Sequence, residues 1–186
     1  MPSPPDLDDL LALLPLAELP RTGWLQAGLP PGIAPETIAG HAHLVALLAL
    51  RLGPIAGVPL DIHRATALAV AHDAAEAFTG DLPRPATAGL GATAKAGLEA
   101  GLFANQLPEL ATLADEYRTG SSPEGRFVRL CDKLQLGLFA LRLTRAGHRG
   151  LDSFADSVAA VDATEFPGLE PIRAALAQEL TAACRS

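Results

Sequence analysis

Aromatic residues are scarce in this 186-residue sequence: Phe, Trp and Tyr together make up 4%, although hydrophobic residues as a whole make up 49%. The core must therefore be built mainly from Ala, Leu and Val, a composition that favours helices over sheets. A period-2 strand pattern and an internal repeat are also missing. The sequence predicts an all-α fold, a compact bundle of about seven helices separated by Pro- and Gly-containing breaks.

Basic residues are also few: the chain has 14 Lys and Arg against 21 Asp and Glu, and its net charge is −7. A nucleic-acid polymer is thereby excluded as the main partner, because its phosphates are bound by clustered cations. A small phosphorylated ligand held by a few local cations is compatible with this charge. No run of 18 apolar residues occurs, because Arg51, Gly53 and Pro54 interrupt the candidate that begins at Leu44. We therefore expect a soluble protein with no membrane partner.

Cysteine is limited to Cys131 and Cys184, which are far apart and form no CxxC pair. We interpret Cys131 as a small buried residue rather than a nucleophile. Residues 1–9 lack a basic region ahead of an apolar stretch, so no signal peptide is predicted. These features predict a cytoplasmic protein, and the length predicts a single domain over residues 1–186.

One apolar stretch contains a concentration of metal-binding and acid–base groups. Residues 60–78 favour a continuous buried helix, and His72, Asp73 and Glu76 stand within it. Burying such groups costs on the order of several kcal/mol unless a metal or a charged substrate compensates. At about 100° per residue, His72 and Glu76 share one face of this helix. A buried His–Asp pair followed by an ordinary helix end is the alternative for this stretch alone.

Further candidate groups lie on other apolar segments, with His41 earlier in the chain and Asp132 later. The order is thus a His, then a His-Asp pair, then a distant Asp. In this order the sequence resembles the HD-domain metal-dependent phosphohydrolases, and more closely their 5'-deoxynucleotidase-like branch. The resemblance covers residues 19–135 and is carried by four stretches, which read LPRTGW from Leu19, PETIAGH from Pro35, HDAAEAFTGDLP from His72 and CDKL from Cys131.

The resemblance implies an HD-domain helical bundle whose metal ligands are His41, His72, Asp73 and Asp132. Two imidazoles and two carboxylates form a mixed set that suits Mn, Fe, Co, Ni or Zn, and Mg is a further candidate. Dinuclear HD enzymes have extra His ligands between the His-Asp pair and the last Asp, where this chain has no His. One divalent cation per chain is therefore expected. The family usually has Glu before the first His, and Gly40 in its place removes a carboxylate close to the metal.

Candidate substrate residues also follow from the resemblance. Arg21 and Trp24 match the family's substrate-binding Arg and Trp. An Arg can donate two hydrogen bonds to phosphate oxygens, and a Trp can stack on a base or sugar. From the sequence alone, a surface Arg and a core Trp explain these residues equally well. Glu76, one turn after His72, is placed to orient or deprotonate the attacking water. Asp81 can protonate the leaving 5' oxygen or hold the sugar, and the resemblance implies that its position discriminates deoxyribose from ribose.

These observations predict a metal-dependent phosphohydrolase that removes phosphate from nucleoside 5'-monophosphates, most of all deoxynucleotides. Two alternatives are open: a phosphatase for another small phosphorylated metabolite, and a catalytically silent nucleotide-binding regulatory domain. Gly40 and the Ala- and Gly-rich segment 86–101, which we predict to be a helix with a mobile start, would fit a shift in specificity. The family further implies a homodimer.

Overall fold

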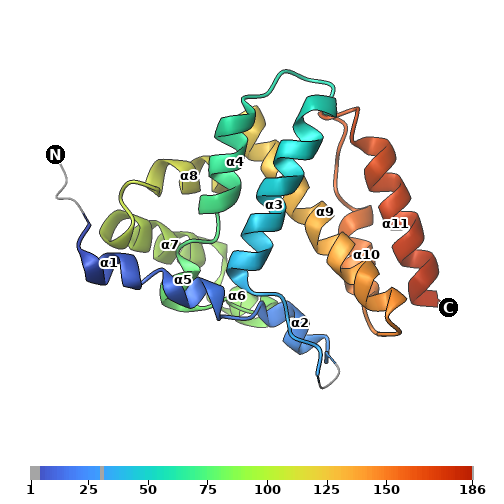
Figure 1. Ribbon diagram of the computed structural model, residues 1–186, viewed down its shortest axis with the longest axis horizontal. Helices are drawn as coiled ribbons and strands as arrows, with labels where there is room; N and C mark the ends of the chain where they lie inside the picture. Colours follow the sequence, from blue (N-terminus) through green and yellow to red (C-terminus); the bar gives the residue numbers. More distant parts are fainter. Residues whose placement is uncertain (1–4, 30–31, 186) are drawn as a thin grey trace. The chain divides into compact units, whose positions relative to one another are not determined.

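The computed structural model of the protein describes residues 5–29 and 32–185, and every regular element in these residues is helical (Figure 1). The prediction of an all-α fold is confirmed. Seven helices in this part of the chain have eight residues or more, in agreement with the predicted number. They are α3 (Ile38–Leu52), α4 (Ile62–Ala71), α7 (Ala92–Gln106), α8 (Ala111–Thr119), α9 (Pro123–Arg145), α10 (Asp152–Ala159) and α11 (Glu170–Arg185).

Short helical segments connect the long ones, and several of them differ from the sequence-based expectation. The helical spacing of Leu7, Leu10, Leu11 and Leu14 predicts a single first helix up to about Leu19. In the structure a separate 3-10 turn begins at Leu14, with Pro15 as its second residue. The Gly and Pro residues between positions 21 and 33 predict a loop, but Thr22–Gln26 form a short helix. The predicted helix over residues 86–101 is divided at Gly91, whose φ is 81°. These segments are α1 (Leu7–Leu11), η1 (Leu14–Ala17), α2 (Thr22–Gln26), η2 (Gly53–Ile55), α5 (Glu76–Thr79) and α6 (Arg84–Leu90).

The chain divides into two compact units, which are described separately here. The first contains residues 1–42 and 71–115, and the second contains residues 43–70 and 116–186. A single domain over residues 1–186 stays a prediction.

The core of the first unit explains where the predicted central helix ends. Ala74 and Ala75 are buried in a cluster with Phe103 and Leu107, which belong to α7 and the residue after it. The backbone at this point tightens, because the N–H groups of Ala74 and Glu76 donate to carbonyls three residues back rather than four. The continuous helix expected over residues 60–78 is therefore wrong: α4 ends at Ala71 and α5 begins at Glu76.

The second unit is built around α9, which packs against α10 and α11 and has most of its residues buried (Figure 1). Ser122 caps the start of α9 by accepting a hydrogen bond from the N–H of Gly125 at 2.9 Å. Near the middle of the helix, Gly137 lets the two neighbouring helices approach closely. A Cβ at this position would lie 2.6 Å from Cγ2 of Val158 and 2.9 Å from Cδ2 of Leu176.

Gly137→Val is expected to lower the free energy of unfolding by about 1–3 kcal/mol, because the added atoms overfill this contact. Gly97→Val is the matched control on α7, since a Cβ there has no heavy atom within 4 Å and its effect is expected to stay within about 0.5 kcal/mol. Thermal unfolding monitored by circular dichroism measures both. Equal midpoints for Gly137→Val and the wild type would contradict the close packing.

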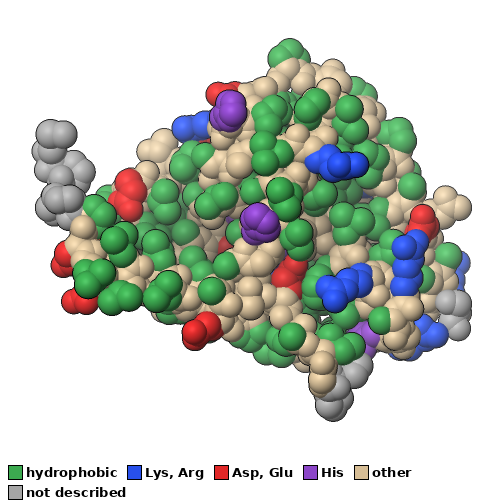
Figure 2. All heavy atoms as spheres, viewed as in Figure 1, with side chains coloured by type: hydrophobic (Ala, Val, Ile, Leu, Met, Phe, Trp, Pro, Cys, Tyr) green, Lys and Arg blue, Asp and Glu red, His purple; other side chains and the backbone are tan. Residues whose placement is uncertain are grey.

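Apolar side chains are exposed along α3, as Figure 2 shows for one face of the molecule. Leu44, Leu47 and Leu50 are each exposed by more than two fifths. By length and composition alone, residues Ile38–Ile55 would be able to cross a membrane. Core helices of water-soluble proteins meet the same criterion, and His41 on this helix is fully buried. The absence of a membrane partner stays a prediction.

Candidate metal site

The first candidate ligand, His41, is fixed by the start of α3. The hydroxyl oxygen of Thr37 accepts a hydrogen bond from the N–H of Gly40 at 3.0 Å, which caps the helix at its N-terminus. Pro is common at the first position of a helix, so Pro35 predicts a helix start at that residue; the observed helix begins later, at Ile38. His41 follows within the first turn and its side chain is 0% exposed.

The second and third candidates, His72 and Asp73, come directly after the end of α4. The packing of Ala74 and Ala75 holds this tight turn in place. His72 is buried, whereas Asp73 is partly exposed and therefore able to face a ligand. Because this turn replaces the predicted helix, its geometry, rather than a shared helix face, determines where His72 and Glu76 point.

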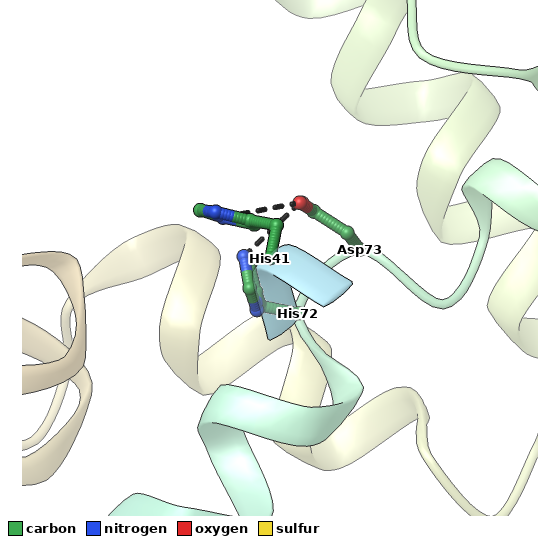
Figure 3. Close-up of side chains that lie close together, drawn as sticks. All are labelled: His41, His72 and Asp73. Carbon is green, nitrogen blue, oxygen red and sulfur yellow. Dashed lines mark ion pairs between the residues drawn. The ribbon is translucent and has the colours of Figure 1, made fainter. Parts of the chain in front are cut away.

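Figure 3 shows the side chains of His41, His72 and Asp73 pointing toward one another. Oδ2 of Asp73 lies 3.8 Å from Nε2 of His41 and 3.1 Å from Nε2 of His72. The two imidazole rings meet edge to face, with centroids 5.3 Å apart. The structure therefore brings together three of the four ligands predicted from the sequence.

This cluster fits a metal ion by its chemistry and its dimensions. Each residue offers one ligand atom, and these atoms lie within 4.8 Å of one another. Atoms bound to the same ion at about 2.1 Å lie no more than about 4.2 Å apart, so small side-chain movements suffice. Imidazole nitrogen and carboxylate oxygen suit a divalent transition metal.

The neighbours of Asp73 favour its ionised form. Burial opposes ionisation, but His72, Arg21 and His41 outweigh it and hold the pKa of the Asp73 carboxyl well below its usual range. Nη1 of Arg21 lies 3.7 Å from Oδ2 of Asp73. Asp73 is therefore an anionic ligand, and the predicted phosphate-binding Arg21 lies next to it.

Glu76 has the opposite electrostatic environment. Burial, together with the nearby carboxylates of Asp73 and Asp81, raises the pKa of the Glu76 carboxyl to about 9, against the smaller effects of Arg21 and Lys95. In the metal-free protein this carboxyl is protonated at neutral pH. Two carboxyls of one site with widely separated pKa values can take different parts in acid–base chemistry.

Lys95 is a charged neighbour of the site that sequence reasoning missed. Its Nζ lies 3.1 Å from Oε1 of Glu99, one turn further along α7. Burial would lower the pKa of Lys95, but the carboxylates of Glu99, Glu76 and Asp73 raise it. A signal was present, because Lys95 and Glu99 are the two charged residues of the Ala- and Gly-rich segment 86–101 and are spaced i,i+4.

The other predicted substrate residues have structural contacts of their own. The indole ring of Trp24 is 1% exposed, which agrees with the core alternative considered from the sequence. Oδ2 of Asp81 accepts hydrogen bonds from the N–H of Thr22 at 2.6 Å and from its hydroxyl at 3.0 Å. Asp81 thus stabilises the first turn of α2, the helix that contains Trp24. Substrate binding by Trp24 and Asp81 stays a prediction.

The fourth predicted ligand, Asp132, lies on α9 in the second unit, so its participation in the site stays a prediction. Its carboxylate is 6% exposed and accepts hydrogen bonds from the Tyr117 hydroxyl at 3.3 Å and from Nζ of Lys133 at 2.8 Å. The neighbouring Cys131 is fully buried and burial raises the pKa of its thiol, which fits its interpretation as a core residue.

Curated relatives support the family expected from the sequence. Human 5'-deoxynucleotidase HDDC2 is 30% identical over 152 residues, which span 77% of this chain and 72% of the human protein. The zebrafish (Danio rerio) 5'-deoxynucleotidase HDDC2 is 28% identical over 140 residues, spanning 70% of this chain and 67% of that protein.

Solved structures share the fold. The PH0347 protein from Pyrococcus horikoshii OT3 aligns with a TM-score of 0.81 at 31% identity, over 94% of this chain and 99% of that one. The HD phosphohydrolase DatZ of cyanophage S-2L, solved with dA and one catalytic Zn²⁺ ion, aligns with a TM-score of 0.63 at 23% identity, over 96% and 99% of the two chains. The sequence pattern that defines the HD domain matches residues 15–169. The chain therefore belongs to the HD domain family.

Proposed function

We propose that this protein, a phosphate-ester hydrolase of the HD domain family, releases inorganic phosphate from nucleoside 5'-monophosphates and prefers those with deoxyribose. The observation that carries the proposal is the cluster of His41, His72 and Asp73 with Arg21 beside it. The curated relatives, which are named 5'-deoxynucleotidases, support the substrate class.

The proposed ligands of one divalent cation are His41, His72, Asp73 and Asp132. When bound, such a cation polarises a phosphoryl oxygen and lowers the pKa of a water molecule, which is the chemistry that hydrolysis of a phosphomonoester needs. Mn, Fe, Co, Ni, Zn and Mg are the candidates, the first five being favoured by the imidazole ligands.

The surrounding side chains have proposed roles that follow from their charges. Arg21 binds the phosphate, because a guanidinium pairs with two phosphate oxygens at once, and Lys95 adds a second positive charge. Glu76 exchanges a proton with the attacking water or with the leaving 5' oxygen. Asp81 acts on the sugar through Oδ1, since both of its hydrogen bonds to Thr22 use Oδ2.

A direct test measures phosphate release from deoxyribonucleoside and ribonucleoside 5'-monophosphates. The metal-stripped protein is reloaded with Mn, Co, Zn or Mg, and ribose 5-phosphate is included as a substrate without a base. The proposal predicts release that depends on the added metal and is fastest with deoxynucleotides.

Other outcomes would select between the remaining interpretations. Faster release from ribose 5-phosphate than from any nucleotide would favour a phosphatase for another metabolite. No release with any metal, although one ion binds per chain, would indicate a regulatory domain. A cytoplasmic location and a homodimer are further proposals, and sedimentation equilibrium of the full chain tests the second.

A further inference from the structure

Two hydrogen bonds join Thr22 to Asp81, residues of the first unit that are 59 positions apart. Oδ2 of Asp81 accepts one from the backbone N–H of Thr22 at 2.6 Å and one from its hydroxyl at 3.0 Å. Both residues are partly buried. Because both donors meet the same oxygen, the carboxylate cannot turn without breaking two hydrogen bonds. The pair therefore fixes the direction in which Oδ1 points.

Thr22 is the fixed partner of this pair. The N–H of Arg21, the residue before it, donates a hydrogen bond to the carbonyl of Glu36 at 2.8 Å. An isolated antiparallel bridge joins Pro20 to Thr37 beside this hydrogen bond. The segment before α2 is thus paired with the segment before α3, and these backbone contacts set the place of Thr22, the first residue of α2.

Asp81 is the partner that is positioned. It lies in the connection between α5 and α6, where residues 80–83 belong to no helix. Gly80 turns the chain at the end of α5 with a φ of 67°, a conformation that L-amino acids rarely adopt. The side chain of Asp81 then ties this connection to the paired backbone at Thr22. The hydrogen bonds therefore place Asp81 rather than Thr22.

The position of Asp81 matters to the candidate metal site. Its negative charge is one of the influences that raise the pKa of Glu76, so the two carboxyls lie near one another. Nη1 of Arg21, the residue directly before Thr22, lies 3.7 Å from Oδ2 of Asp73. Two consecutive residues, Arg21 and Thr22, therefore contact two carboxylates of the segment that carries Glu76, one on each side of it in the sequence.

We propose that Thr22 is a positioning residue that makes the site selective for deoxyribose by fixing the carboxylate of Asp81. A carboxylate that can turn either accepts a hydrogen bond from the 2'-hydroxyl of ribose or makes room for it. One that is fixed through Oδ2 does neither, so a ribonucleotide loses binding relative to a deoxynucleotide. The inference rests on the proposed function, in which Asp81 acts on the sugar, and it names the residue that gives this action its precision.

Three substitutions at position 22 remove the donors stepwise. Thr22→Ser keeps both, and Thr22→Val keeps the shape and the N–H but removes the hydroxyl. Thr22→Pro removes both donors. The backbone suits this change, because Pro is tolerated at the first residue of a helix and Arg21 before it is extended, with φ −68° and ψ 118°.

The measured quantity is the ratio of kcat/KM for a deoxyribonucleoside 5'-monophosphate to that for the ribonucleotide with the same base, in the metal-loaded protein. Thr22→Ser is expected to keep the wild-type ratio. Thr22→Val is expected to lower it about 3-fold and Thr22→Pro about 10-fold or more, the range for one and two lost hydrogen bonds. Thr112→Val, exposed on α8 in the same unit, is the matched control. The ratio does not depend on the fraction of folded protein, so a merely structural role would leave it unchanged.

Amide hydrogen exchange tests the contact itself without any substrate. The N–H of Thr22 is expected to exchange at least about 10-fold faster in Asp81→Ala, because its acceptor is removed. Trp24, the single Trp of the chain, is buried in α2. An unchanged emission maximum of Trp24 shows that this helix keeps its place in each variant.

Loss of selectivity in Thr22→Val and Thr22→Pro, with the wild-type ratio kept in Thr22→Ser, would support the inference. A wild-type ratio in a folded Thr22→Pro would overturn it and leave the proposed function intact. If Thr22→Pro does not fold, a wild-type ratio in Thr22→Val or an unchanged exchange rate in Asp81→Ala would overturn it. A wild type that hydrolyses both kinds of nucleotide equally well would contradict the deoxyribose preference and the inference with it. A wild type without phosphate release would overturn the proposed function and the inference together.

Discussion

Asparagine at position 73 is expected to reduce phosphate release by about 10³-fold or more and to remove most of the bound metal. Oδ2 of Asp73 is the atom around which Nε2 of His41, Nε2 of His72 and Nη1 of Arg21 gather. Asn keeps the size of the side chain but lacks the negative charge. That charge is what binds a divalent cation and pairs with the guanidinium of Arg21. A bound metal lowers the activation free energy by several kcal/mol, and losing this stabilisation of the transition state corresponds to a rate loss of about 10³-fold.

Metal content by mass spectrometry and kcat/KM for a deoxynucleotide measure the two parts of this prediction. Asp156→Asn is the matched control, because Asp156 is exposed on α10 and its substitution should change neither quantity. Thermal unfolding shows whether Asp73→Asn keeps its fold. A folded Asp73→Asn variant that retains one ion per chain and the wild-type rate would exclude Asp73 as a ligand.

The elements predicted best from the sequence are those whose signals are local. Pro123, followed by Leu136, Phe139 and Leu143 at core spacing, predicts a long helix up to about Arg145. Helix α9 has these bounds, with Ser122 as its cap. The break between α4 and α5 was missed for the opposite reason. It depends on Ala74 and Ala75 packing against Phe103 and Leu107, residues about 30 positions away, and helix propensity does not include such contacts.

The same distinction applies to the site. His41, His72 and Asp73 were identified because their order along the chain is characteristic of the family. The ion pair between Arg21 and Asp73 was not identified, because it joins two segments that are 52 positions apart in the chain. Side chains from different segments meet only in the folded chain, and a pattern with a period of 3.6 residues relates only residues on one helix.

Glu76→Gln is expected to have the second large effect, and that effect should be visible without a metal. The pKa of Glu76 is about 9 in the folded chain, against 4.5 for an ordinary Glu. Between these values the folded protein binds a proton that the unfolded chain has released. The contribution of Glu76 to stability is therefore fully present below about pH 4.5 and is lost progressively as the pH rises toward 9.

Gln is uncharged at every pH and removes this dependence. The free energy of unfolding of Glu76→Gln is compared with that of the wild type in the presence of a chelator. Between pH 5 and pH 8 the difference is expected to change by about 2 kcal/mol in favour of the variant. This is less than the full pKa shift of Glu76 implies, because the side chain is partly exposed to solvent. Urea unfolding at both pH values measures this difference, with Glu109→Gln as the control. A constant difference would show that Glu76 is ionised in the folded metal-free protein.

The catalytic consequence of the same substitution can be separated from its effect on stability. With the metal restored, Glu76→Gln is expected to lower kcat by about 10²- to 10⁴-fold, the range for removal of a general acid or base. The metal content is expected to stay unchanged, because Glu76 is not among the proposed ligands.

The pH profile of kcat then distinguishes the two proton-transfer roles. Loss of a limb that falls above neutral pH identifies Glu76 as the acid, and loss of a limb that rises with pH identifies it as the base. A Glu76→Gln variant with wild-type kcat would exclude both roles and leave Glu76 as a buried neutral group beside Asp73.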